Sequence, residues 1–328
     1  MGFAFVIQVE NPPPGAPPAP VEPPGKSKAR FGQRFNRMEE APFGLLLLAP
    51  AALLMFLINF LPLLYAVRTS FQKVQLTASA ERPWVGLKNY RTILHDPIFW
   101  ESVVRTIWFA AVVIVVGTTI SMITALTLNE RFPGRSIARV MLLLPWAVAS
   151  LVTGVMWNYL FNGKFGVVNA ILKELGLIDR YIDFLGDSRR ALSIAAVATA
   201  WKLIPFLSLM LLASMQSIPD ALYRSARMDG ANVWKRFTVI TFPHLRTVFS
   251  VVIVYQVVAA LLAFDFIYGF TQGGPGYGTT VVNYLIYINA FQRLNLGVAS
   301  AMALLLTLLI VGISGISLAI IAGRRKRL

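Results

Sequence analysis

Few side chains in this sequence could act on a reacting bond or hold a metal. The 328 residues include two histidines, His95 and His244, and no cysteine. Without cysteine the chain can form no disulfide, thiolate zinc site or iron–sulfur cluster, and it has no thiol nucleophile. We find no serine, histidine and aspartate arrangement of a hydrolase and no paired acid–base carboxylates. The sequence therefore predicts a protein that is not an enzyme and binds no metal.

Two charged side chains stand out because they are the ionisable residues that lie deepest in the apolar stretches. Lys202 lies near the middle of one stretch, and Asp265 lies nearer the end of another. A charge at the centre of a bilayer costs about 3 kcal/mol or more, so each should face protein or a water-filled cavity. Their depths differ by roughly 9 Å at the helical rise, which argues against a direct ion pair. Both could line a route for a polar solute, and Asp265 could equally cap the loop that follows it.

The composition indicates a membrane protein. Hydrophobic residues make up 56% of the chain and charged residues 14%, whereas soluble domains are about a quarter charged. A soluble chain of this length needs a polar surface that these residues cannot supply. Much of the net charge of +15 comes from the tails and the inner loops, where membrane topology explains it. Apart from the spans, tails and loops the chain contains no nucleic-acid-binding module, so we expect no nucleic acid as a partner.

Six apolar stretches are long enough to cross a bilayer, which takes about 20 residues. Continuous apolar runs indicate helices, because the strands of a barrel would alternate. We therefore predict an all-α, polytopic protein with six transmembrane helices and no folded soluble domain. The predicted spans are residues 43–67, 103–128, 137–161, 191–213, 247–270 and 298–322. The outer segment 167–177 is amphipathic and predicts a short interfacial helix.

The two ends of the chain are basic. Lys26, Lys28, Arg30, Arg34 and Arg37 precede the first span, and residues 323–328 form a short basic tail. The positive-inside rule places both termini in the cytoplasm, with an even number of crossings between them. Residues 11–24 hold eight prolines in fourteen positions, so we expect residues 1–42 to be a disordered tail before a membrane domain of residues 43–322. Its basic residues could rest on anionic lipid headgroups of the bilayer.

The most informative loop is residues 217–243, after the fourth span. Pro219 suits the first turn of a helix. Asp229 and Gly230 predict a turn, because glycine tolerates positive φ and aspartate can cap the next helix. A second helix from residue 231 to Pro243 carries apolar residues at helical spacing, namely Val233, Trp234, Phe237 and Ile240. The loop therefore predicts a cytoplasmic helix–turn–helix elbow, and the alternative is an amphipathic loop that lies on the headgroups.

This elbow resembles the cytoplasmic signature loop of ATP-binding-cassette (ABC) importer permeases. That loop runs Glu-Ala-Ala, two residues, Asp-Gly-Ala, five residues, Phe, two residues, Ile, one residue and Leu-Pro. The positions that match at the same spacing are Ala226, Asp229, Gly230, Ala231, Phe237, Ile240 and Pro243. Arg224 stands at the family's Glu position, Ser225 at its first Ala and Phe242 at its Leu. The resemblance implies that this is a coupling helix seated in a separate ATPase, with Arg224 and Ser225 at its rim.

Other segments are similar to the carbohydrate branch of the same family. They are Leu144-Pro145-Trp146, Trp157–Phe161, Trp201-Lys202, Phe264–Tyr268 and Gly273-Gly274-Pro275. The resemblance covers residues 40–322 and implies the type I ABC importer permease fold. It points to the subfamily that imports maltose, trehalose, related oligosaccharides and glycerol 3-phosphate.

The resemblance also implies a set of partners in the bacterial cytoplasmic (inner) membrane. They are a second permease subunit, a pair of identical ATPase subunits that bind ATP and Mg²⁺, and an extracytoplasmic solute-binding protein. Residues Gly273, Gly274, Pro275 and Tyr277 would contact the binding protein. This chain itself is expected to bind no cofactor. Gly25-Lys26-Ser27 ends like a nucleotide-binding loop, but Pro20 stands where the first glycine belongs.

Polar and aromatic residues of the spans are candidates for the solute route, because sugar rings combine apolar faces with many hydroxyl groups. Most aromatic residues in spans are interface anchors or packing elements. The candidates are Trp146, Trp157, Asn158, Tyr159, Lys202, Tyr255, Gln256 and Asp265.

Two other functions are alternatives for a chain of this class. A secondary carrier driven by an ion gradient would need coupling carboxylates at midplane and often an inverted repeat. Asp265 is the single acid within the predicted spans, and the sequence shows no repeat. A membrane-anchored scaffold or sensor would need a soluble output domain, for which the loops leave no room.

Overall fold

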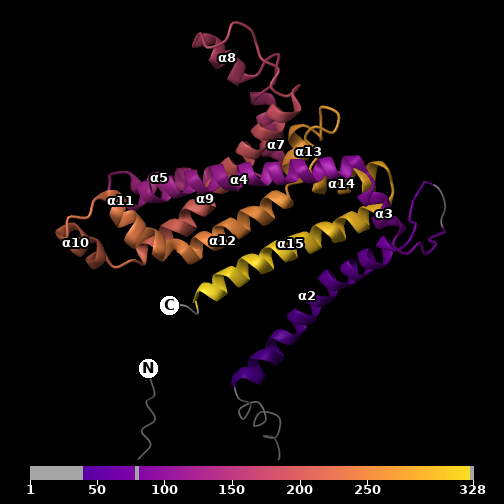
Figure 1. The fold of residues 1–328 in the computed structure, drawn as a ribbon, viewed down its shortest axis with the longest axis horizontal. Coiled ribbons are helices and arrows are strands. Elements are labelled where there is room, and N and C mark those ends of the chain that lie inside the picture. The colour runs from indigo at the N-terminus through magenta and orange to yellow at the C-terminus, as the bar shows by residue number, and fades with distance from the viewer. Residues whose placement is uncertain (1–39, 78–80, 326–328) are drawn as a thin grey trace, which may run out of the picture. The chain divides into compact units, whose positions relative to one another are not determined.

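The computed structural model describes residues 40–77 and 81–325, and most of them are helical (Figure 1). The chain divides into two units, residues 1–61 and 62–328, and every helix from residue 88 onward belongs to the second unit. Within the described residues there is no strand longer than an isolated bridge, such as Gln72 with Trp84. The predicted all-α class is confirmed.

The helices have the following bounds. They are α2 Glu40–Ser70, α3 Lys88–Leu94, α4 Pro97–Asn129, α5 Arg135–Leu142, α6 Leu144–Ala147, α7 Ser150–Leu160, α8 Val167–Glu174, α9 Ser188–Gln216, α10 Asp220–Met228, α11 Val233–Arg236, η1 Phe237–Thr241, α12 Phe242–Leu261, α13 Asp265–Phe270, α14 Val282–Tyr287, η2 Ile288–Gln292 and α15 Leu296–Arg325.

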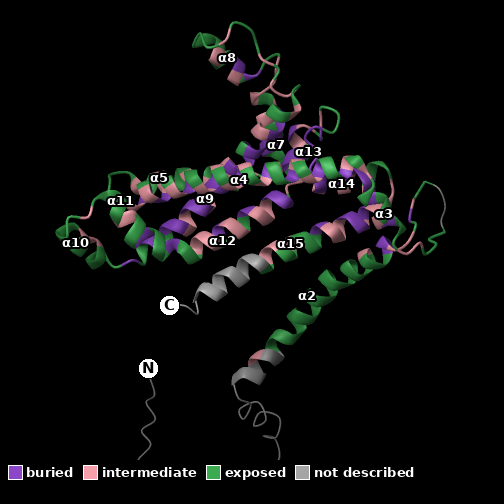
Figure 2. Cartoon of the chain, in the orientation of Figure 1, coloured by how far each residue is buried: buried purple, intermediate pink, exposed green. Residues whose placement is uncertain are grey.

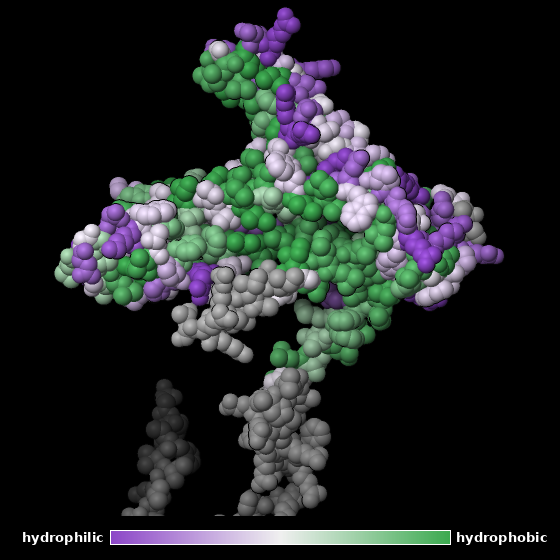
Figure 3. Space-filling view, in the orientation of Figure 1, coloured by the Kyte–Doolittle hydropathy of each residue, from purple (hydrophilic) through white to green (hydrophobic). Residues whose placement is uncertain are grey.

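Five helices are long and apolar enough to cross a membrane, and a sixth span results if one bent pair is counted. The five are Leu47–Ser70, Pro97–Asn129, Ser188–Gln216, Val233–Leu261 and Leu296–Gly315. Figure 3 shows hydrophobic side chains over these helices and hydrophilic ones near α10 and near the loop before α3.

The prediction of one continuous helix over residues 137–161 is wrong. This stretch is the bent pair, Arg135–Ala147 and Ser150–Leu160, whose axes differ by 93°. Pro145 lacks an amide N–H and cannot continue the hydrogen bonds of α5. Val148 and Ala149 then adopt extended backbone, with ψ of 135° and 140°, which turns the chain before α7.

The predicted fifth span, residues 247–270, is displaced toward the N-terminus. A continuous helix runs over Val233–Leu261, and residues 262–264 break it before the short helix α13. Asp265 therefore begins a separate helix, and its depth does not follow from the rise of a continuous one.

The ends of the membrane domain also differ from the prediction. Helix α2 begins at Glu40, so residues 40–42 are helical, and the rest of the predicted N-terminal tail lies outside the described residues. Helix α15 continues through Arg325, so half of the predicted C-terminal tail is helical, and residues 326–328 lie outside the described part. The short outer helix predicted over residues 167–177 is observed as α8, Val167–Glu174.

The packed centre of the second unit is formed by α9 against α4 and α12. Half of the apolar window of α9 is buried, and Figure 2 shows buried residues along it. Small residues dominate the contact, because they let helix backbones approach closely where lipid offers no hydrophobic drive. They include Ala195, Ala196 and Ala200 on α9, and Gly117 and Ser121 on α4.

Helices α7 and α13 cross at two glycines. A Cβ atom on Gly154 would lie 2.5 Å from the backbone oxygen of Phe266 and 3.0 Å from the amide nitrogen of Phe270. A Cβ atom on Gly269 would likewise meet the backbone oxygen of Leu151. The side chain of Asn158 closes the contact by donating to the Phe270 carbonyl at 2.6 Å. Backbone-to-backbone packing thus fixes α13 to α7.

We expect Gly154→Ala to separate α7 from α13, because the new methyl group meets backbone atoms that cannot rotate away. The cost should be about 1–3 kcal/mol of stability, seen as a lower thermal unfolding temperature of the purified chain in detergent. Gly312→Ala on α15 is the matched control, because nothing lies within 4 Å of its Cβ position. Equal unfolding temperatures for the two variants would contradict this packing.

Candidate functional site

The loop after α9 folds as the predicted helical elbow. Helix α10 begins after Pro219, its N-cap residue, with Asp220 in the first turn, where a carboxylate interacts favourably with the helix dipole. Gly230 adopts φ of +73°, which only glycine reaches without strain. Its turn is closed by the hydrogen bond from the Ala231 amide to the Ala226 carbonyl, at 2.9 Å. We call residues 217–243 the elbow.

The second arm of the elbow differs from the prediction. Asn232, and not Asp229, caps it, since the Asn232 side chain accepts from the amide of Lys235 at 2.8 Å. Pro243 does not end the helix but lies in the first turn of α12. The preceding turn, η1, is a π-helix. Its wider winding removes the clash that a proline ring makes with the carbonyl four residues earlier, so the helix runs on into the span.

The tip of the elbow exposes apolar side chains with nothing covering them within the described residues. Met228 is 82% exposed, Val233 73% and Trp234 72%. The two arms of the elbow are linked, because Tyr223 of α10 and Thr241 of η1 share a hydrogen bond between hydroxyls at 2.9 Å.

Most of the predicted coupling residues are accessible to solvent in the structure. Arg224, Ser225, Asp229, Gly230 and Pro243 are exposed, and Ala226, Ala231 and Phe237 are partly so. Ile240 is 9% exposed and faces the interior, so its contribution is to pack the elbow and not to form its outer surface.

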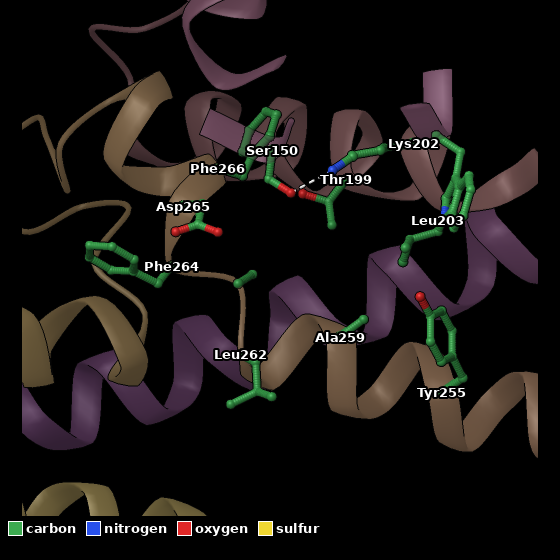
Figure 4. A pocket seen from close by; sticks show the side chains of 12 residues that line it. Ser150, Thr199, Lys202, Leu203, Tyr255, Ala259, Leu262, Phe264, Asp265 and Phe266 are labelled. Atoms are coloured by element: carbon green, nitrogen blue, oxygen red, sulfur yellow. Dashed lines mark hydrogen bonds between the residues drawn. The ribbon is translucent and has the colours of Figure 1, made fainter. Parts of the chain in front are cut away.

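A second feature is a cavity of about 230 Å³ among α6, α7, α9, α12 and α13. Lys202 of α9 and Asp265 of α13 enter it from opposite walls (Figure 4). Lys202 donates from Nζ to the Ser150 hydroxyl at 2.5 Å. The ion pair that the structure records within the described residues joins Arg105 to Glu101, so Lys202 and Asp265 share the cavity without a direct bridge.

Aromatic rings form part of the cavity wall. Phe206 lies between two rings that line it, with centroids 5.9 Å from Trp146 and 5.1 Å from Tyr255. Trp146 is 48% exposed and Tyr255 38% exposed, so both keep area available for a ligand. Faces of this kind stack on the apolar faces of sugar rings, while Lys202, Ser150 and Asp265 supply donors and acceptors for hydroxyl groups.

Four of the eight predicted route residues therefore meet in one cavity: Trp146, Lys202, Tyr255 and Asp265. The other four lie elsewhere. Asn158 bonds the Phe270 carbonyl, and Gln256 is fully buried and donates to the Thr118 hydroxyl at 2.7 Å. Trp157 stacks on Phe161, and the 60% exposed Tyr159 contacts Phe165.

Ser150 and Thr199 line the cavity although no sequence pattern selected them. Ser150 reaches the cavity because α7 starts there, after the 93° bend. Pro145, inside an apolar run, was the available signal for that bend.

The glycine-rich outer loop is closed on itself. The Gly273 carbonyl accepts from the Thr279 amide at 3.1 Å and from the Thr280 hydroxyl at 3.2 Å. A Cβ on Gly273 would lie 2.6 Å from that hydroxyl, and Gly273 has φ of +81°. Gly273 is thus buried and shapes the loop, Gly274 is half-buried, and Pro275 and Tyr277 are exposed. The Tyr277 hydroxyl accepts from Arg293 Nη2 at 3.1 Å.

The described residues do not form a ligand set of the kind that holds a metal ion. Over residues 40–77 and 81–325, no three His, Cys, Asp or Glu side chains gather as ligands.

Membrane-spanning helices, an exposed elbow at one end and a polar cavity within them are the architecture of a transport permease. Residues 117–327 match the family described as binding-protein-dependent transport system inner membrane component. The chain belongs to this family: it is an ABC importer permease of the inner membrane. The family that the sequence predicted is confirmed.

Two curated relatives and one solved structure show the closeness of the match. The trehalose/maltose transport system permease protein MalF of Thermococcus litoralis is 34% identical, over 89% of this chain and 97% of the relative. The sulfoquinovosyl glycerol transport system permease protein SmoG of Agrobacterium fabrum is 34% identical, over 84% of this chain and 89% of the relative. A crystal structure of a bacterial ABC transporter involved in import of the acidic polysaccharide alginate superimposes with a TM-score of 0.76 at 22% identity. It covers 89% of this chain and 98% of that chain, and it confirms the predicted fold.

We expect Asn158→Ala to destabilise the protein without changing what it transports. The substitution leaves the buried Phe270 carbonyl without its side-chain donor, at a cost of about 1–3 kcal/mol. Thermal unfolding in detergent measures this loss, with Tyr159→Phe as the exposed neighbouring control. A variant of unchanged stability but altered solute preference would show that Asn158 contacts solute instead.

Proposed function

We propose that this chain is the membrane-spanning subunit of an ATP-driven, binding-protein-dependent importer for an oligosaccharide or a sugar-like solute. The observation that carries the proposal is the elbow with an exposed apolar tip, which joins two of the helices that line the cavity. A separate ATPase would seat this tip in a cleft and move it.

The elbow is placed to pass a movement to the cavity. It joins the end of α9 to the start of the continuous helix that contains α12. Lys202 lies on α9 and Tyr255 on α12, and both line the cavity. Because the two arms are linked by the Tyr223–Thr241 hydrogen bond, a push on the tip would reach both α9 and α12.

The ATP and Mg²⁺ of the cycle would be bound by a pair of identical ATPase subunits, and this chain would hold no cofactor. Closure of that pair on ATP would bring the elbows together and open the spans outward, and hydrolysis would reset them inward. Arg224, at the position where the family has Glu, would place a positive charge at the rim. A paired ATPase would therefore present a matching negative or neutral surface.

The cavity chemistry supports a sugar as the solute. Pockets for drug-sized ligands occupy roughly 300–1,000 Å³, so a cavity of about 230 Å³ would hold a single ring-sized part of an oligosaccharide. Trp146 and Tyr255 would stack on that ring, and Lys202 and Asp265 would bond its hydroxyl groups. Relatives named for trehalose/maltose and sulfoquinovosyl glycerol transport are consistent with this class.

The remaining partners follow from the family. An extracytoplasmic solute-binding protein would deliver solute to the outer face and meet Pro275 and Tyr277 on the outer loop, whose shape Gly273 and Gly274 set. A second permease subunit would complete the membrane passage. Both termini would lie in the cytoplasm, so the bent pair α5–α7 would count as one of six crossings. The ion-gradient carrier has no specific observation in its favour.

Gly230→Val tests the elbow. A β-branched side chain is strained at φ of +73°, so the tip should distort, and solute-stimulated ATP hydrolysis and uptake should fall at least tenfold. The measurement is uptake by proteoliposomes that contain the complete importer, with insertion checked by the yield of purified assembly. Gly176→Val is the matched control, since Gly176 has φ of +67° and equally open surroundings but lies beside α8. Normal uptake by Gly230→Val would contradict the coupling role.

Lys202→Met and Asp265→Asn test the cavity. Each removes a charged hydrogen-bonding group, which is worth about 1.5–3 kcal/mol, or roughly tenfold and more in half-saturating solute concentration. Uptake of labelled trehalose, maltose or glycerol 3-phosphate by the complete importer measures the effect. Lys164→Gln, an exposed lysine of the outer segment, should leave uptake unchanged. If the cavity variants behave like this control, the solute route lies elsewhere.

A further inference from the structure

Two arginines of α5 converge on the last residue of α9. Arg135 and Arg139 lie one helical turn apart, and with its amide oxygen facing them Gln216 accepts from both. The oxygen lies 2.9 Å from Nη2 of Arg135 and 2.8 Å from Nη2 of Arg139. The two guanidinium groups therefore stand less than about 6 Å apart, a distance at which like charges repel.

No acidic side chain balances these two charges. Within the described residues, neither Arg135 nor Arg139 has a carboxylate partner, since the recorded ion pair is Arg105 with Glu101. The Nε atoms of both arginines are buried and bond nothing. A neutral amide and the partial negative charge at the end of α9 are what face them, and together these fall short of two positive charges. The cluster therefore carries a net positive charge, which suits binding of an anion.

The position of the cluster identifies that anion. Gln216 is the last residue of the span Ser188–Gln216, so the guanidinium groups lie where hydrocarbon gives way to headgroups. The opposite face of α5 exposes Ile137 by 65%, Val140 by 62% and Met141 by 57%, as suits a helix at the edge of the hydrocarbon. The abundant anion at that level of a membrane is the phosphate of a lipid headgroup.

We propose that Arg135, Arg139 and Gln216 form a binding site for the phosphate of an anionic phospholipid. Planar guanidinium forks match phosphate oxygens with two parallel hydrogen bonds each, and basic pockets between spanning helices suit such headgroups. The bound headgroup bridges α5 and the end of α9, directly before the elbow. By linking α5 to the last residue of α9, the headgroup would hold in place the end of α9 from which the elbow starts.

The test uses the complete importer in nanodiscs of phosphatidylcholine with or without phosphatidylglycerol. Native mass spectrometry counts the phosphatidylglycerol that stays on the released complex. The wild-type complex is expected to retain phosphatidylglycerol over phosphatidylcholine. The double variant R135Q/R139Q should bind it roughly 25-fold more weakly, at about 1 kcal/mol for each basic residue.

Two controls distinguish binding at this site from nonspecific electrostatic attraction of anionic lipid to a basic protein. Arg131→Gln removes an exposed charge from the same loop and should retain the lipid. R135K/R139K keeps both charges but loses the planar forks, so it should fall between wild type and R135Q/R139Q. The preference of the wild-type complex for phosphatidylglycerol needs no variant, so the test stands even if R135Q/R139Q fails to assemble.

Three results would overturn the proposal. One is equal retention of phosphatidylglycerol and phosphatidylcholine by the wild-type complex. Another is displacement of the lipid by inorganic phosphate at matched concentration, which would make the anion a soluble one. The third is loss of the ATPase subunits from R135Q/R139Q in lipid-free detergent, which would assign the arginines to a carboxylate of a protein partner.

Discussion

In a bilayer every backbone N–H and C=O group must find its partner within the protein, and this constraint decides where the chain can interrupt a helix. Two interruptions border the cavity, at residues 148–149 and 262–264. The α7–α13 contact and the neighbouring helices pack around them. At the second interruption the Leu262 carbonyl is satisfied locally, since it accepts from the Phe264 amide at 2.8 Å and from the Asn283 side chain at 3.0 Å. The glycine crossing joins α7 and α13, the helices that follow the two interruptions.

The same two interruptions create the polar cavity. Ser150 begins the helix after the first break, and Asp265 begins the helix after the second. In a continuous helix, the direction of each side chain is set by the roughly 100° rotation per residue. Ser150 and Asp265 would then have no reason to lie at the same depth or to face each other. The breaks instead turn both toward Lys202 on the uninterrupted helix α9. The uninterrupted helix α9 thus lies between two interrupted neighbours at the cavity.

The sequence predicted the parts that depend on local chemistry. Apolar runs located the spans because a bilayer leaves no other environment for them, and the turn at Gly230 followed from its freedom in φ. The family followed from the spacing between Ala226 and Pro243. The bend before Ser150 depends on how α7 meets α13, which no local pattern contains. For the same reason Asn158 and Gln256 resembled route residues, although tertiary contacts assign their amides to the Phe270 carbonyl and the Thr118 hydroxyl. Pro243 misled because a π-turn accommodates it.

The feature of Lys202 and Asp265 that matters for binding is that no salt bridge joins them. A buried pair in direct contact would be neutralised and rigid, and breaking it would cost several kcal/mol. Here the ammonium is held by the Ser150 hydroxyl, a neutral acceptor that a solute hydroxyl can replace on nearly equal terms. The Asp265 carboxylate stands exposed at the other wall. In the solute site that we propose, a solute with several hydroxyl groups would therefore span the gap without first breaking an ion pair. A transport site must release what it binds, and in the proposed solute site two charges kept apart suit that requirement better than two charges joined.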